Sequence, residues 1–188
     1  MTGSDTITTQ GSSIFSVHGG NGGGSGVGGN GGSITIQGSR NVTLAGDMDA
    51  EGDGGGAKGG TIVLKAGTVP NATLNIQSAA VIQADAINTN GTGTDGTITL
   101  SDSCKVQLSG MVDTRNTNLS KGTNSVTYRD TFITDLGSSL LADDVLGGNN
   151  VTCRCTGGCS SCVNPPTQGG TVNPPWNVTK SALPACGS

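Results

Sequence analysis

A short strand-like motif recurs along most of this chain and constrains the fold more than any other feature. The segments TITTQGSS at Thr6 and SITIQGSR at Ser33 nearly coincide, and TIVLK, TITLS and SVTYR follow at Thr61, Thr97 and Ser125. The motifs are separated by 27, 28, 36 and 28 residues, so one unit carries eight extra residues, which we place within AGTVPNATLNIQ. A repeat of this length is typical of architectures in which each unit packs on the next.

Each motif alternates apolar residues with Ser, Thr or other residues, as a half-buried strand does. Ile34 and Ile36 therefore share one face of a strand, and the opposite face is rich in hydroxyls. A second apolar group follows in NVTLAGDM, AVIQADAI and KVQLSGMV, which predicts a second strand in every unit. A loop comes next, as GGNGGGSGVGGNGG, EGDGGGAKGG, NTNGTGTDG and then RNTNLSKGTN, so we interpret the glycine runs as one repeated corner of a coil.

The composition fits a coil that buries small side chains. The 188 residues include 34 glycines, and only 2% are aromatic, so a conventional core of large side chains is excluded. Glycine and asparagine tolerate the left-handed backbone conformations that tight corners need. We therefore predict an all-β fold, a parallel β-helix (β-solenoid) of about five coils with glycine-rich corner loops.

The cysteines gather near the end of the chain and predict a second region. We expect a solenoid over residues 1–150 and a Cys/Pro-rich C-terminal cap or extension over 151–188. The even number favours disulfides, and hence an extracellular or cell-surface protein; the six cysteines are Cys104, Cys153, Cys155, Cys159, Cys162 and Cys186. Six cysteines allow 15 pairings, which stay open. A zinc site in CRCTGGCSSC is the alternative interpretation.

The tail after the cysteine cluster repeats VNPP and contains the only tryptophan, Trp176. Prolines force an extended path, so we expect no further coils here. The tail then either caps the last edge of its own solenoid or acts as an arm that docks on a neighbouring molecule, with Pro165, Pro174 and Trp176 as the candidate contacts.

A family resemblance supports the fold. GGSITIQGSRNVTLAGDMDAEGDGGGAKGGTIVLKAG resembles the right-handed parallel β-helix segments of bacterial secreted surface proteins of filamentous-haemagglutinin type, in which ITL or VTL strands precede an A-x-G or D-A-x-G turn and a glycine-rich loop. The resemblance covers roughly residues 6–150 and implies a fold rather than a function. It assigns no functional residue.

Charge, hydropathy and residue types exclude several function classes. The net charge is −4 with few charges of either sign, so no basic face is expected for nucleic acid. No apolar run approaches the roughly 20 residues of a membrane span. His18 is the only histidine and no serine lies in a nucleophile motif, so we expect no enzyme. Six N-glycosylation sequons are present, at Asn41, Asn71, Asn90, Asn118, Asn150 and Asn177.

A column of hydroxyl residues is the first candidate binding feature. Threonine at alternate strand positions resembles the faces of ice-binding β-solenoids, and it also simply suits an exposed strand. The candidate residues of this face are Thr35, Thr61, Thr97, Thr99 and Thr127.

A column of aspartates is the second candidate. Asp49, Asp85 and Asp113 take the same place in three coils once the extra eight residues are removed. Stacked carboxylates repel unless they are solvated, protonated or bridged by a cation such as calcium. Acidic residues near an arginine also resemble polysaccharide lyases, with Arg115 as the base. The alternative is that each aspartate starts the turn by accepting backbone N–H groups.

These observations favour a non-enzymatic extracellular structural or adhesive module. Its partners would be further copies of itself, joined head to tail into fibres, or a surface or glycan, and no cofactor is required. An ice-binding solenoid that uses the Thr/Ser face is the main alternative. A calcium-dependent carbohydrate-active β-helix is the third.

Overall fold

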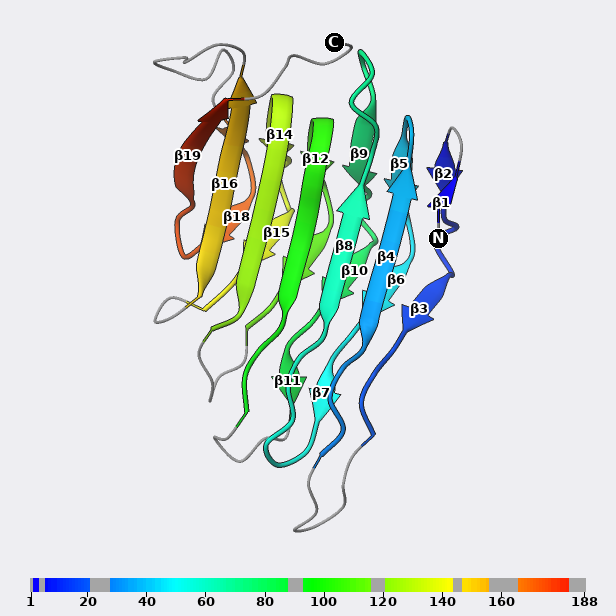
Figure 1. Ribbon diagram of the computed structural model, residues 1–188, viewed down its shortest axis with the longest axis vertical. Helices are drawn as coiled ribbons and strands as arrows, with labels where there is room; N and C mark the ends of the chain where they lie inside the picture. Colours follow the sequence, from blue (N-terminus) through cyan, green and yellow to red (C-terminus); the bar gives the residue numbers. More distant parts are fainter. Residues whose placement is uncertain are drawn as a thin grey trace.

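The computed structural model describes residues 2–3, 6–20, 28–87, 93–115, 121–143, 147–155 and 166–182. These residues form strands and short turns, and no helix among them is long and apolar enough to cross a membrane. The strands pair in parallel and form a β-solenoid of about four turns (Figure 1). The predicted all-β parallel solenoid is confirmed, with about four turns rather than five.

Three flat faces surround the core, and each is one ladder of parallel strands. Face A contains β4 (Ser33–Gly38), β8 (Thr61–Lys65), the first halves of β12 (Thr97–Leu108) and β14 (Thr123–Thr134), β16 (Gly148–Cys155) and β19 (Asn177–Ala182). These strands lie side by side in Figure 1. The short β1 (Thr2–Gly3) pairs with the end of β4.

Face B contains β2 (Ile7–Thr8), β5 (Val42–Leu44), β9 (Thr73–Ile76), the second halves of β12 and β14, and β17 (Thr167–Gln168). The long strand β12 serves two faces because its pairing shifts register near Ser103, where the chain turns the corner. Face C contains β3 (Ile14–Ser16), β6 (Asp47–Asp49), β10 (Val81–Gln83), β13 (Met111–Asp113), β15 (Ser139–Leu141) and β18 (Thr171–Asn173). A two-stranded extension pairs β7 (Gly52–Asp53) with β11 (Ala86–Ile87).

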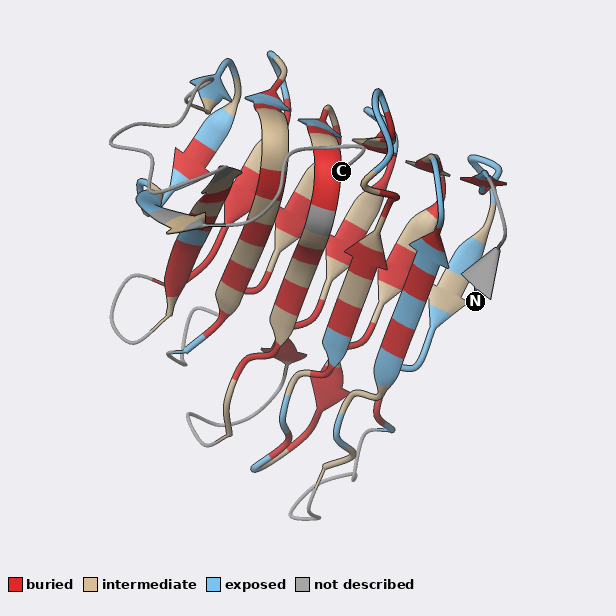
Figure 2. Cartoon of the chain, turned by 45° about the horizontal axis from the view of Figure 1, so that its top comes forward, coloured by how far each residue is buried: buried red, intermediate tan, exposed pale blue. Residues whose placement is uncertain are grey.

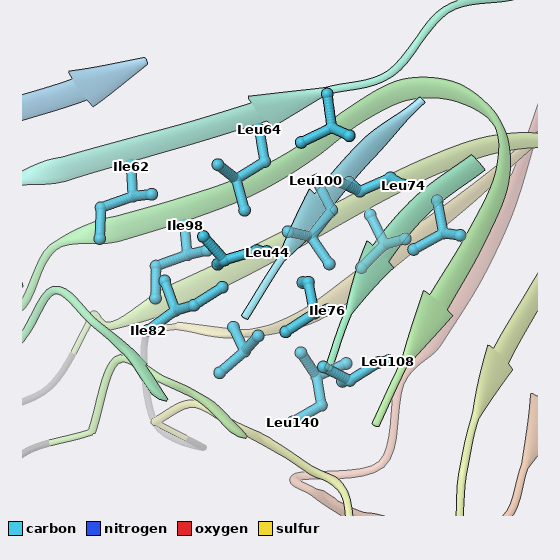
Figure 3. Packing of buried hydrophobic residues seen from close by; sticks show 14 of the residues in the cluster. Leu44, Ile62, Leu64, Leu74, Ile76, Ile82, Ile98, Leu100, Leu108 and Leu140 are labelled. Carbon is cyan, nitrogen blue, oxygen red and sulfur yellow. The ribbon is translucent and has the colours of Figure 1, made fainter. Parts of the chain in front are cut away.

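Alternate side chains of every face point inward and stack on their equivalents in the next coil. On face A, Ile34, Ile62 and Ile98 share one column and are buried. On face C, Met48 and Ile82 do the same. The alternation appears as bands along each strand in Figure 2, and Figure 3 shows the leucines and isoleucines meeting in one narrow core. The prediction that the isoleucines and leucines of these strands share one inward face is therefore confirmed.

Glycines precede the strands of face A because the backbone is crowded there. The amide of Gly60 donates to the Ala50 carbonyl at 2.6 Å, which joins the end of face C to the start of face A within one coil. A Cβ on Gly60 would lie 2.1 Å from the Gly32 carbonyl oxygen of the previous coil, so no other residue fits. Residues 21–27 of the glycine-rich segment at 18–37 lie outside the described residues.

Three expectations about register were wrong. Ile7 pairs with Val42, so the motif at Thr6 belongs to face B and is not equivalent to the motif at Ser33. Thr97 pairs with Thr123, so β14 begins inside the stretch RNTNLSKGTN that we expected to be a loop. The eight extra residues are also divided among three corners. A residue and its partner in the next coil are separated by 28 residues at Ser33, by 32 at Val42 and by 34 at Met48.

The described part of the C-terminal region continues the solenoid. Strand β16 runs through the expected boundary at residues 150 and 151, and β17, β18 and β19 pair with β14, β15 and β16. The expectation that prolines prevent further coils was wrong because Pro174 and Pro175 lie between β18 and β19, where no ladder N–H is needed.

Candidate functional site

An acidic corner lies where face C ends and the chain turns back toward face A. Asp49 and Asp113 occupy the same column, as predicted, with Gln83 between them. Asp85 does not belong to this column, because Ala86 pairs with Gly52 and this places Asp85 beside Glu51. The predicted alignment was therefore wrong for Asp85, and the uneven distribution of the eight extra residues is the reason.

Asp49 and Asp113 each begin a turn. Asp49 Oδ1 accepts the backbone N–H of Glu51 at 2.9 Å, and Asp113 Oδ1 accepts that of Arg115 at 2.9 Å. The interpretation of these aspartates as turn-starting residues is confirmed at both positions. Their carboxylates lie two coils apart, roughly 9.6 Å at the usual strand spacing, so one ion does not bridge them directly.

Arg115 neutralises Asp113. The guanidinium donates from Nε to Oδ1 at 3.0 Å and from Nη2 to Oδ2 at 2.9 Å. These hydrogen bonds to Asp113 raise the pKa of Arg115 above its ordinary value. A guanidinium held in its charged form is a poor base, which weakens the polysaccharide-lyase interpretation.

Asp49 instead meets His18, which follows β3 in the previous coil. His18 Nδ1 lies 3.1 Å from Asp49 Oδ2 and 3.5 Å from Glu51 Oε2, and Nε2 lies 3.8 Å from Asp53 Oδ2. The single histidine thus faces three carboxylates from the segment DAEGD. Sequence reasoning noted His18 and Asp49 but missed Glu51 and Asp53, although the alternation of acids in DAEGD was an available signal.

Glu51 and Asp85 form a carboxyl pair behind His18. Burial, followed by a hydrogen bond with Asp85, raises the pKa of Glu51 to about 8. The pKa of Asp85 is also raised, chiefly by burial. Asp85 is only 9% exposed, and its Oδ1 is buried without a hydrogen-bond partner among the described residues. A proton kept on one carboxyl supplies the donor of their hydrogen bond, whereas full ionisation would place two negative charges side by side.

A second carboxyl pair, Asp95 and Asp143, lies farther along the same side of the solenoid. Asp95 Oδ1 accepts the Ala86 N–H at 2.9 Å, and Asp143 Oδ2 accepts the Gly122 N–H at 2.8 Å. Burial, followed by a hydrogen bond with Asp143, raises the pKa of Asp95 to about 8. Both hydrogen bonds join the segment that follows face C to the segment that precedes a strand of face A. Asp95 Oδ2, like Asp85 Oδ1, is buried without a hydrogen-bond partner among the described residues.

The predicted Thr/Ser face lies on the outside of face A. Ser33, Thr61, Thr97 and Thr123 form one unbroken hydroxyl column. Thr35 and Thr99 belong to the next column, which Val63 interrupts. Thr127 lies in a third column, since Ser125 rather than Thr127 pairs with Thr99. The face exists, but Thr127 is two positions away from the predicted alignment.

The C-terminal candidates lie on their own chain where they are described. The ring of Trp176 packs against Phe132 with centroids 5.4 Å apart, and the Pro174 carbonyl accepts the Asn149 side-chain amide at 2.7 Å. Cys104 and Cys153 are buried and disulfide-bonded. Pro165, Cys159, Cys162 and Cys186 lie outside the described residues, as does the side chain of Cys155.

Comparison with known proteins finds no matching family model, no matching curated protein and no matching solved structure.

Proposed function

We propose that this chain is a non-enzymatic extracellular structural module whose two ends join head to tail into fibres. The observation that carries the proposal is the pair of unlike ends of the described solenoid, where no described residue covers the last strands. Every coil has an inner surface that stacks on the coil before it and another that stacks on the coil after it. The first described coil leaves one stacking surface uncovered by described residues, and the last leaves the other. These two surfaces are complementary because the same two kinds of surface pack on each other inside the solenoid.

The N-terminal end opens into the core. A cavity of about 310 Å³ lies between β3 and β4 and is lined by Phe15, Val17 and Ile34, among others. β3 is the terminal strand of the six-stranded ladder on face C. A preceding coil would fill this cavity in the way that each coil fills the one before it.

The C-terminal end presents the opposite surface. β19 ends the ladder of face A and β18 ends that of face C. Val178 continues the inward column of Val126 and Val151, which are buried, yet it is 39% exposed because no coil follows it among the described residues. An end strand that offers its backbone and an apolar side chain is a template for another coil.

The extracellular location rests on cysteine chemistry. Disulfides persist in oxidising compartments and are rare in the cytosol, so the disulfide-bonded Cys104 and Cys153 support secretion. The outer surface of face A, with its Ser, Thr and Asn side chains, is the part of the module that a surface or glycan partner would contact. The remaining cysteines would complete a disulfide-linked C-terminal cap.

Electron microscopy of concentrated protein tests the assembly. We expect fibres whose width is that of one solenoid, and Val17→Lys and Val178→Lys should each shorten or abolish them, because a lysine at either end places a charge in the apolar junction. Val69→Lys is the matched control, since Val69 is 37% exposed at a lateral corner, compared with 36% for Val17. Isolated rods from the unaltered protein would overturn the proposal.

A second candidate function, ice binding, rests on the unbroken hydroxyl column of Ser33, Thr61, Thr97 and Thr123. Thermal hysteresis that disappears in Thr61→Tyr and Thr97→Tyr would favour this function over fibre formation. The third function, a calcium-dependent carbohydrate-active β-helix, would need Arg115 as its base, and this guanidinium is paired with Asp113.

A further inference from the structure

The cluster of His18, Asp49 and Glu51 has the geometry of a metal site. One ligand atom from each residue lies within 4.8 Å of the others. The imidazole Nδ1 is 3.1 Å from the Asp49 carboxylate and 3.5 Å from that of Glu51. Ligands bound to zinc at its usual distances of about 2.0–2.1 Å lie roughly 3.3 Å apart in a tetrahedron, so both separations match.

The orientation of the histidine suits a metal ligand. Nδ1 points to the Asp49 and Glu51 carboxylates, while Nε2 lies on the side of Asp53, at 3.8 Å from its Oδ2. In metal sites the ring nitrogen that does not bind the ion usually faces a carboxylate or carbonyl, which fixes the tautomer. Asp53 occupies that position.

Asp85 supplies an independent indication of a ligand. Its side chain is more than nine-tenths buried, it contacts the Glu51 carboxyl, and its Oδ1 has no hydrogen-bond partner among the described residues. Buried polar atoms normally have a partner. A cation held by Glu51 would balance the charge of the buried carboxylate behind it.

We propose that His18 Nδ1, Asp49 and Glu51 bind a divalent first-row transition cation, of which zinc is the representative, with Asp85 as the buried carboxylate behind the site and Asp53 as the partner of His18. An imidazole ligand favours zinc and its neighbours over calcium, which prefers oxygen. The ion would link β3 of one coil to the β6–β7 corner of the next. The proposal does not rest on fibre formation, because all three ligands belong to one chain.

Isothermal titration calorimetry of the whole chain with zinc chloride tests the proposal. The protein carries no polyhistidine tag, is treated with a chelator and stays under non-reducing conditions, so that its disulfides cannot supply thiolates. We expect one ion per chain and a rise in the thermal unfolding temperature. His18→Gln and Glu51→Gln should each weaken binding by about 100-fold, as the loss of a ligand does.

Asp113→Asn is the matched control, because Asp113 starts the equivalent turn two coils away and faces Arg115 instead of a histidine. It should bind zinc like the unaltered protein. Cobalt(II) offers a second readout, since its visible absorption should report nitrogen and oxygen ligands and change in His18→Gln.

Three results would overturn the proposal. The first is no zinc binding at millimolar concentration, which would leave His18 as an ordinary ion-pair partner of the acids. The second is zinc binding that His18→Gln does not alter. The third is calcium binding that is tighter than zinc binding and is equally insensitive to His18, which would indicate a site of carboxylates alone.

Discussion

The same inward column of face A is filled in two different ways. In the earlier coils it contains Ile34, Ile62 and Ile98, and in the next two it contains Asn124 and Asn149. The isoleucines exclude water and need no partner. The asparagines form an amide ladder in which Asn124 donates from Nδ2 to Asn149 Oδ1 at 2.9 Å and to the Leu141 carbonyl at 2.7 Å.

Polar side chains are therefore accommodated in this buried column when their atoms have hydrogen-bond partners. Asn149 continues the ladder by donating to the Leu140 carbonyl of β15 and to the Pro174 carbonyl that follows β18. Both asparagines are as buried as the isoleucines they replace. The later coils also hold the aromatic group of Tyr128, Phe132 and Trp176. Variants in each kind of coil test whether the isoleucine column and the asparagine ladder contribute similar stability.

The largest effect is expected in the aliphatic coils. Ile62→Ala removes a fully buried side chain between two stacked neighbours and should lower the free energy of unfolding by about 3–4 kcal/mol. Urea denaturation followed by circular dichroism measures the loss. Ile133→Ala is the control, because Ile133 is 37% exposed and should cost far less. A loss below about 1 kcal/mol at Ile62 would mean that the column is not tightly packed.

Breaking the amide ladder should have the next largest effect. Asn124→Ala leaves Asn149 Oδ1 without its donor and removes one donor from the Leu141 carbonyl, which still accepts the Thr114 N–H at 3.0 Å. The loss should be about 2 kcal/mol. In a double-mutant cycle with Asn149→Ala, the two losses should not add, and a coupling above about 0.5 kcal/mol is expected. Additive losses in the same urea experiment would show that the two amides act separately.

The aromatic group of the later coils should contribute less. Phe132 lies between Tyr128, with ring centroids 6.1 Å apart, and Trp176, at 5.4 Å. Phe132→Leu keeps an apolar side chain but removes both ring contacts, so we expect a loss of about 1.5 kcal/mol. Quenching or a shift of the fluorescence of the single tryptophan gives a local readout. Unchanged fluorescence together with unchanged stability would contradict the described packing.

The last prediction concerns the carboxyl groups, which, unlike the asparagines, bring a donor only when they are protonated. Asp95 is buried with a pKa raised from 3.8 to about 8, so the folded state retains a proton that the unfolded state loses. Stability should therefore fall as the pH rises from about 4 to about 8. We expect the unfolding temperature to drop over this range, and thermal unfolding followed by circular dichroism at several pH values measures the drop. Asp95→Asn should flatten the profile, and a profile equal to that of the unaltered protein would contradict the assignment.

The sequence predicts the aliphatic part of the fold well and the polar part poorly. Ile34, Ile62 and Ile98 alternate with hydroxyl residues, and this period of two identifies a strand and its inner face. Asn124 carries no such signal, because asparagine beside glycine and threonine indicates a loop. Trp176 was likewise read as part of a tail, since two prolines precede it, although it packs on Phe132.

The candidate site was predicted in part. Asp49 and Asp113 share a column because they start equivalent turns, and a fixed repeat interval finds them. Asp85 was placed two residues off, because the sequence gives the total number of extra residues in its coil but not how they divide among the corners. The meeting of His18 with Asp49 was not predicted, because it depends on where the chain enters the corner after β3.

The sequence by itself determined that this chain is a coil of parallel strands, because alternation and spacing are local properties that any stacked repeat must satisfy. The tertiary structure alone decided which residues of neighbouring coils lie side by side. Register depends on how each corner accommodates its length, and a shift of two residues keeps every side chain on its face while changing all of its neighbours. The amide ladder, the carboxyl pairs and the histidine cluster are contacts between coils, so they exist only once that register is fixed.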